Sequence, residues 1–229
     1  MKNKIQTKQK IINKGTGAGG ANTVHNGSQF EELTNIEPLL LSKSFDTKIL
    51  NKTKNGYYLT KNFTKDTKDT KDTENDSDPR CDDKKDDTNQ KTITYSKQCG
   101  FKTYIKKEFN IDIYRHPDEA YVIKTKKDNV YHYNIKILEK KNQNGEGSVE
   151  DKLKTGAFNR KEYILMFEKM KDNITIDYAF TVSKFLEDKF ESNKPKYNNI
   201  KKINNDDNIK IFYASKSNYF EEIYEWICN

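Results

Sequence analysis

Residues 117–143 read PDEAYVIKTKKDNVYHYNIKILEKKNQ, two runs of apolar and aromatic residues separated by Lys126-Lys127-Asp128-Asn129. Asp and Asn favour tight turns, so this stretch predicts an antiparallel hairpin. Its first strand starts at Pro117-Asp118 and its second runs from Val130 to Lys141. The hairpin would place Asp118 across from the end of the second strand.

Side-chain alternation divides the second predicted strand into two faces. One face carries Tyr131, Tyr133, Ile135, Ile137, Glu139 and Lys141, and the other carries His132, Asn134, Lys136 and Leu138. Glu139 and Lys141 therefore share a face that is otherwise apolar or aromatic. Charged groups are costly to bury there unless they are paired or bound to a metal.

The expected neighbourhood of Asp118, Glu139 and Lys141 has a specific chemistry. Two carboxylates can hold a divalent cation, and a lysine can position or activate a water while stabilising charge on a phosphate. Gln143 shares the parity of Glu139 and Lys141 and is a weaker candidate for the same site. The alternative is a surface Glu-Lys ion pair, because a lysine-rich chain contains many Glu-x-Lys patterns.

The rest of the C-terminal part predicts alternating helices and strands, which indicates an α/β domain with a mixed sheet. Predicted helices cover Phe101–Phe109, Arg160–Lys171 after a break at Gly156, a segment capped by Ser183, and a last segment capped by Ser217. Predicted strands cover Ile111–Tyr114, Ile174–Val182 and Asn208–Ala214, and Ser148-Val149-Glu150-Asp151 has the pattern of a capping box.

Composition limits how much of the 229-residue chain can be packed. Only 33% of residues are hydrophobic and the mean hydropathy is −1.07, although 14 Tyr and 12 Phe supply bulky core residues. Residues 64–90 repeat Thr-Lys-Asp three times and then become Asp-rich, which predicts a disordered, low-complexity insertion. We expect a single domain over residues 1–229 that carries this insertion.

The charge distribution favours a polyanionic partner such as nucleic acid. The chain has a net charge of +7, and residues 64–90 contain ten acidic and six basic residues, which leaves +11 for the remainder. A lysine-rich composition can also reflect an AT-rich genome. Cys81, Cys99 and Cys228 have no zinc-type spacing, and no long apolar segment occurs, so a soluble cytoplasmic protein is expected.

The N-terminal segment contains glycines whose spacing matches G-x-G-x-x-G at Gly15, Gly17 and Gly20. No buried strand precedes them and no βαβ unit follows, which argues against dinucleotide binding, and no Gly-Lys-Ser/Thr closes a Walker A loop. Residues 1–27 are either a flexible glycine-rich arm or a loop whose backbone approaches phosphates.

A capping box at Ser28–Glu31 predicts a helix that carries Phe30, Leu33, Ile36 and Leu40. Glu31 is then either a cap on a solvated helix surface or a carboxylate presented to the metal site.

Together these motifs resemble a known family. Pro117-Asp118 with Glu139-Lys140-Lys141 matches the signature of the PD-(D/E)XK nuclease superfamily, and the order of elements is similar to its αβββαβ core. A wider set resembles type II restriction endonuclease-like proteins of bacteria and large algal viruses: residues 15–23, Asn26-Gly27 with Phe30-Glu31, Pro117–Ala120, Leu138–Gln143 and Gly147–Leu153.

The resemblance implies a site-specific endonuclease that cleaves double-stranded DNA with Mg²⁺, for which Mn²⁺ can substitute. Asp118 and Glu139 would bind the metal, Lys141 would be the catalytic lysine, Glu31 an assisting acid and Gln143 a further site residue. It also implies a homodimer, a DNA grip or dimer contact at the glycine-rich segment, and a cognate DNA methyltransferase in a restriction-modification system. Two alternatives stay open, a nuclease without sequence preference or with a repair or junction substrate, and a catalytically silent nucleic-acid-binding protein.

Overall fold

A computed structural model describes residues 21–50, 56–63, 90–143 and 149–229. The chain divides into two compact units, residues 1–35 and residues 36–229. The described part of the first unit consists mainly of helix α1 (Ala21–Leu33), and all other helices and strands belong to the second unit.

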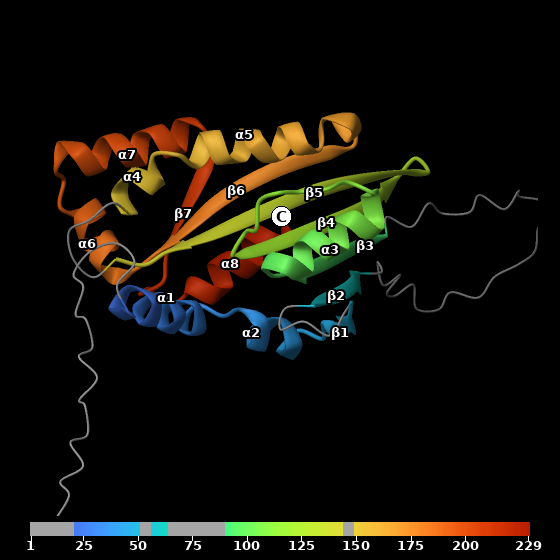
Figure 1. The fold of residues 1–229 in the computed structure, drawn as a ribbon, viewed down its shortest axis with the longest axis horizontal. Helices are drawn as coiled ribbons and strands as arrows, with labels where there is room; N and C mark the ends of the chain where they lie inside the picture. The colour runs from blue at the N-terminus through green and yellow to red at the C-terminus, as the bar shows by residue number, and fades with distance from the viewer. Residues whose placement is uncertain (1–20, 51–55, 64–89, 144–148) are drawn as a thin grey trace, which may run out of the picture. The chain divides into compact units, whose positions relative to one another are not determined.

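The described residues of the second unit form a seven-stranded mixed sheet in the order β1-β2-β3-β4-β5-β6-β7 (Figure 1). Neighbours from β1 to β5 are antiparallel, whereas β5, β6 and β7 are parallel. The strands are β1 (Asp46–Ile49), β2 (Tyr57–Phe63), β3 (Lys91–Ser96), β4 (Glu119–Lys127), β5 (Val130–Lys141), β6 (Ile174–Val182) and β7 (Ile209–Tyr213). The predicted α/β class with a mixed sheet is confirmed.

Helices cover both faces of this sheet and create two apolar cores. The first core lies under α3 (Gln98–Phe109), α5 (Gly156–Met166), α6 (Lys184–Glu191) and α7 (Pro195–Asp206), with α4 (Val149–Leu153) and the 3-10 helix η1 (Glu168–Met170) nearby. The second core lies under α2 (Glu37–Ser42) and α8 (Tyr219–Cys228). We call these sides of the sheet the α5 face and the α8 face.

The β4–β5 hairpin forms as the sequence predicts. Lys127 pairs with Val130, so Asp128 and Asn129 form a two-residue loop. Their φ angles are 49° and 61°, in the left-handed region that Asn and Asp tolerate better than most residues. Two such residues match a turn whose twist suits an antiparallel hairpin.

The predicted strand at Ile111–Tyr114 is wrong. This fully described segment lacks regular structure and forms an extended strap, residues 110–117, between α3 and β4. Ile113 is buried in the α5-face core, whereas Tyr114 and Arg115 contact Glu162 on α5. The alternation of buried and exposed side chains in this segment therefore reflects its packing against α5 and not pairing with a strand.

Helix boundaries differ from the sequence expectations in the second half of the chain. Gly156 is the first residue of α5 and not a break before it. A Cβ at this position would lie 2.9 Å from Asn204 Oδ1 and from the Phe180 ring, so only glycine fits there without a shift of its neighbours. The helix ends at Met166 and continues only as η1. Asn218, and not Ser217, occupies the N-cap position of α8.

The three expected helix caps have different outcomes. Ser28 lies inside α1, which already begins at Ala21 and ends at Leu33, so it does not open a helix. In the expected capping box Ser148–Asp151, Ser148 lies outside the described residues, and α4 begins at the next residue, Val149. Glu150 is buried and accepts hydrogen bonds from Lys196 and Tyr197 on α7. Ser183 occupies the N-cap position of α6 as expected, although its hydroxyl donates to the Gln143 carbonyl at 2.8 Å and not to the helix.

Several elements were not predicted, namely strands β1 to β3 and helix α7. The predicted insertion connects β2 to β3, and its residues 64–89 lie outside the described residues, as do residues 1–20 of the predicted arm, whereas Ala21–Gly27 belong to α1. Within the described ranges, no helix has both the length and the apolar character needed to cross a membrane.

Candidate functional site

Asp118 and Glu139 are brought together by the register of β4 and β5. Glu119 pairs with Leu138, so one step outward Asp118 faces Glu139. Ala120 and Ile137, the next pair on the same side, are buried in the α5-face core. Both carboxylates therefore project on the α5 face, at the end of the sheet where the sequence predicts them.

Hydrogen bonds fix the positions of these side chains. Asp118 Oδ2 accepts from the backbone N–H of Lys140 at 2.7 Å, and Lys141 Nζ donates to Glu139 Oε2 at 2.7 Å. The side chains of Glu139 and Lys141 are each 17% exposed, so the cluster is sheltered yet reachable from solvent. Glu139-x-Lys141 is thus an ion pair next to a second carboxylate, and not a pair on an open surface.

The charge of Glu139 is unfavourable in this setting. Burial raises the pKa of the Glu139 carboxyl above 4.5, and the nearby Asp118 carboxylate raises it further. Lys141 and, more weakly, Arg115 lower the pKa of Glu139 and oppose this shift without cancelling it. Two close carboxylates with this electrostatic balance gain stability from an additional cation.

Three residues that the sequence did not single out adjoin this cluster: Arg115 on the strap, and Glu162 and Tyr163 on α5. The Arg115 guanidinium forms an ion pair with Glu162, which also accepts a hydrogen bond from Tyr114 at 3.3 Å. Tyr163 is 1% exposed, and its ring packs against the ring of Tyr178 on β6, with the ring centroids 6.5 Å apart. In the sequence, Arg115 could have been noticed only through the scarcity of arginine, since three of the 42 basic residues are arginines.

Lys140 projects to the α8 face and anchors the same strands from behind. Its ammonium lies 2.6 Å from Glu119 Oε1, and both side chains are almost fully buried. The hydroxyls of Tyr95 and Tyr121 donate to the two oxygens of Glu119 at 3.3 and 2.7 Å. This buried network fixes the register of β4 and β5 at the point where Asp118 meets Glu139.

Gln143 and Glu31, the two weaker site candidates, do not join the cluster of Asp118, Glu139 and Lys141 in the described contacts. Gln143 is buried just beyond β5, where its backbone N–H donates to Ser183 Oγ at 3.2 Å and ties the ends of β5 and β6 together. Glu31 lies exposed on α1 in the first unit. The structure thus unites Asp118, Glu139 and Lys141, and the roles of Gln143 and Glu31 stay predictions.

The donor set suits Mg²⁺ better than a soft metal. Asp118 and Glu139 offer carboxylate oxygens, and Mg²⁺ in phosphate-processing proteins is commonly bound by one or two carboxylates together with substrate phosphate and waters. Among the described residues there is no group of three or more His, Cys, Asp or Glu side chains placed to hold a metal. Two carboxylates and an added phosphate ligand are compatible with the Mg²⁺ expectation.

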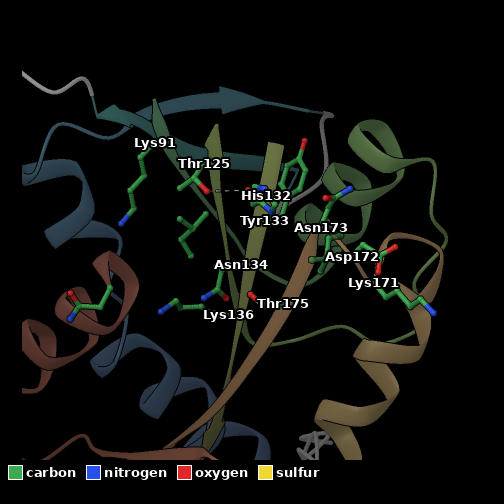
Figure 2. A pocket seen from close by; sticks show the side chains of 13 residues that line it. Lys91, Thr125, His132, Tyr133, Asn134, Lys136, Lys171, Asp172, Asn173 and Thr175 are labelled. Carbon is green, nitrogen blue, oxygen red and sulfur yellow. Dashed lines mark hydrogen bonds between the residues drawn. The ribbon is translucent and has the colours of Figure 1, made fainter. Parts of the chain in front are cut away.

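A cavity of about 320 Å³ lies at the opposite end of the sheet and has a structural explanation (Figure 2). Lys91 and Lys136 contribute to its lining. The Lys136 ammonium donates to the Trp226 carbonyl at 2.5 Å, and Lys91 donates to the Cys228 carbonyl. Cations commonly stabilise the carbonyls at a helix C-terminus, so these lysines secure the end of α8.

The carboxylates and the lysine at the end of β4 and β5 therefore form the candidate site. Comparisons of the chain with protein-family models, with curated proteins and with solved structures gave no match. The arrangement can chemically bind a hard divalent cation, hold a phosphate group beside it and position a water for attack.

Proposed function

We propose that this protein is a Mg²⁺-dependent endonuclease that hydrolyses double-stranded DNA at specific sites, in the manner of type II restriction enzymes. The observation that carries the proposal is the position of Asp118 directly before β4, hydrogen-bonded to the Lys140 backbone of β5, beside Glu139 and with Lys141 Nζ 2.7 Å from Glu139. This is the arrangement expected for the PD-(D/E)XK signature.

The surrounding topology supports the same superfamily. Strands β3, β4 and β5 are antiparallel neighbours in the sheet, with α3 between β3 and β4 in the chain; α4 and α5 follow β5, and β6 returns parallel to β5. That order is similar to the βββαβ part of the superfamily's core. The net charge of +7 supports a polyanionic substrate.

The proposed reaction is attack of water on a backbone phosphorus atom. The new bond joins the water oxygen to phosphorus, the bond to the 3′ oxygen breaks, the water loses a proton, and the 3′ oxygen gains one. Mg²⁺, when bound by Asp118 and Glu139, would supply positive charge that neutralises the phosphate and acidifies a water. Lys141 fixes the orientation of Glu139 and offers N–H donors to the water or to a phosphate oxygen.

The backbone of Lys140 contributes through its N–H, which holds the Asp118 carboxylate 2.7 Å away and keeps it oriented. The proposal extends to a homodimer, because a two-fold symmetric site in DNA is naturally read by two identical subunits. A partner methyltransferase that protects the same site belongs to the proposal as well.

The test is cleavage of supercoiled plasmid DNA in Mg²⁺ by the purified wild-type protein and by Asp118→Asn, Glu139→Ala and Lys141→Ala. We expect each substitution to lower the cleavage rate at least about 100-fold, the scale of losing an electrostatic catalytic group. Matched control variants come from the exposed ion pair of Lys106 and Asp112, in which Nζ and Oδ2 are 2.7 Å apart. The Asp112→Asn and Lys106→Met proteins should cleave DNA at the wild-type rate.

The products of a large natural DNA separate the proposed activity from its alternatives. Discrete fragments support site-specific cleavage, whereas a smear supports a nuclease without sequence preference. Salt-sensitive DNA binding with no turnover in Mg²⁺ or Mn²⁺ indicates a silent binding protein and contradicts the proposal. Cleavage that persists in Glu139→Ala or Lys141→Ala also contradicts it.

A further inference from the structure

Two buried donors beside the carboxylates lack acceptors. The Tyr163 hydroxyl and Arg115 Nε are both shielded from solvent and have no hydrogen-bond partner among the residues that the structure describes. An unsatisfied buried donor costs on the order of 1–3 kcal/mol, so such a group needs an explanation. Neither donor is used by the proposed roles of Asp118, Glu139 and Lys141.

The packing places these donors beside the site. Tyr163 packs on Tyr178 of β6, which pairs with Ile137, and the next position on that face of β6, Phe180, pairs with Glu139. Arg115 is three residues before Asp118 on the strap and is held against α5 by Glu162. Both therefore approach the carboxylates from the layer that covers the α5 face.

Electrostatic influence agrees with this placement. Burial raises the pKa of the Tyr163 hydroxyl, and the charge of Glu139 raises it further, whereas Arg115 acts in the opposite direction. Asp118 and Glu162 also raise the pKa of Tyr163. The hydroxyl thus stays protonated at neutral pH and is available as a donor.

We infer that Arg115 and Tyr163 form a subsite for a backbone phosphate of the nucleic acid, next to Asp118 and Glu139, and this inference rests on the proposed function. A phosphate oxygen is the acceptor that both donors lack. The ion pair with Glu162 engages the Nη2 end of the guanidinium, so Nε is left without an acceptor in the described structure. Arginine is well suited to this role because its planar fork donates several N–H groups to one phosphate.

The test measures binding of a fluorescein-labelled 30-base-pair duplex in Mg²⁺, by anisotropy at several salt concentrations. The Lys141→Ala background keeps the DNA intact. We expect Arg115→Gln to reduce the slope of log K against log salt by about one, the signature of one lost phosphate contact. Tyr163→Phe should weaken binding about three- to tenfold with the slope unchanged, because only a neutral donor is removed.

Matched controls exist for both substitutions. Arg160 donates to the carbonyls of Ile176 and Asp207, so Arg160→Gln should leave the salt slope unchanged. The Tyr178 hydroxyl accepts from Asn159 at 3.1 Å, so Tyr178→Phe should affect stability and not DNA affinity. Tyr163→Phe should not lower the melting temperature of the free protein, because its hydroxyl has no protein partner in the described residues.

The outcomes separate this inference from the proposed function. Wild-type slope and affinity in both Arg115→Gln and Tyr163→Phe would overturn the subsite, even if the wild-type protein cleaves DNA. A lost salt contact in Arg115→Gln without cleavage by the wild-type protein would support the subsite and reject the nuclease. A lower melting temperature for Tyr163→Phe together with unchanged binding would show that the hydroxyl serves packing alone.

Discussion

At the scale of single residues, Glu139 lowers the stability of the metal-free protein at neutral pH. Its pKa is raised above 4.5 by burial and by Asp118, although Lys141 opposes this shift. The unfolded carboxyl releases its proton near its ordinary pKa, whereas the folded one retains it to higher pH. Stability is therefore lost as pH rises from the unfolded pKa through the folded pKa.

Glu139→Gln should consequently stabilise the metal-free protein at pH 7 by about 0.5–2 kcal/mol, a common gain when a functional residue is neutralised. The gain should shrink as the pH falls from the raised folded pKa toward 4.5 and be absent below it, where the wild-type carboxyl is neutral in both states. Urea unfolding at several pH values measures both effects. Added Mg²⁺ should stabilise the wild type and not the variant, and an equal response of the two would contradict metal binding by Glu139.

The buried pair of Glu119 and Lys140 should have a larger effect on stability. Lys140→Met leaves a buried carboxylate without its cation and should cost about 3–5 kcal/mol. The double variant Glu119→Gln/Lys140→Met should recover part of that loss, because it removes both charges. Lys154→Met, in the exposed pair with Asp151, is the control and should change stability by less than about 0.5 kcal/mol. A Lys140→Met cost no larger than that of Lys154→Met would show that the buried network contributes nothing.

The candidate site could be predicted only where strand periodicity determines it. The parity of β5 placed Glu139 and Lys141 together, and the hairpin placed Asp118 opposite, because both follow from local geometry. Arg115 and Tyr163 could not be found that way. Their positions depend on how the strap 110–117 packs on α5, which is a contact between segments distant in sequence.

At the scale of elements, the β4–β5 hairpin depends on its two-residue turn. Asn129 has φ 61°, a conformation that is strongly unfavourable for β-branched side chains. Asn129→Val should therefore cost about 1–2 kcal/mol in thermal or urea unfolding, while Asn129→Gly is tolerated. Equal stability of the Val and Gly variants would mean that the turn can change conformation without loss.

Element prediction succeeded for strands with strong patterns and failed for those that depend on neighbours. β5 and β6 match the predicted Val130–Lys141 and Ile174–Val182, because both are long runs rich in β-branched and aromatic residues. β3 is a short segment beside a charged, Thr-rich tract, and it becomes a strand by pairing with β2 and β4. Helix α7 buries only Tyr197, Ile200 and Asn204, so its apolar stripe is too sparse to predict a helix.

At the scale of the whole molecule, buried tyrosines should make the stability of the fold decrease at alkaline pH. Burial raises the pKa of Tyr95 and Tyr121 on the α8 face, where Glu119 adds to the effect, and burial raises the pKa of Tyr104 to about 12. Unfolded tyrosines ionise near their ordinary pKa of 10.0. Because the folded pKa of these tyrosines is raised, their contribution to stability is complete below the unfolded pKa and is lost as the pH rises from there through the folded pKa.

We therefore expect cooperative unfolding above about pH 10. The phenolate absorbance of the buried tyrosines should appear in the same transition as the loss of circular dichroism. Tyr95→Phe should move the transition to higher pH, because it removes one group whose ionisation drives unfolding. Complete ionisation of these tyrosines at ordinary pH, with the secondary structure intact, would contradict the burial that the fold assigns to them.

The connection between β2 and β3 joins the sheet at Phe63 and Lys91, and Lys91 pairs with Thr125. Thr125 is seven residues along β4 from Asp118, a separation of about 23 Å in an extended strand. The junction therefore lies at the end of the sheet away from the carboxylates. A biotin-acceptor peptide spliced directly next to Phe63 or Lys91 would couple the protein to a sensor chip from that end of the sheet. The proposed DNA cleavage could then be sought in single molecules attached at the end of the sheet opposite Asp118 and Glu139.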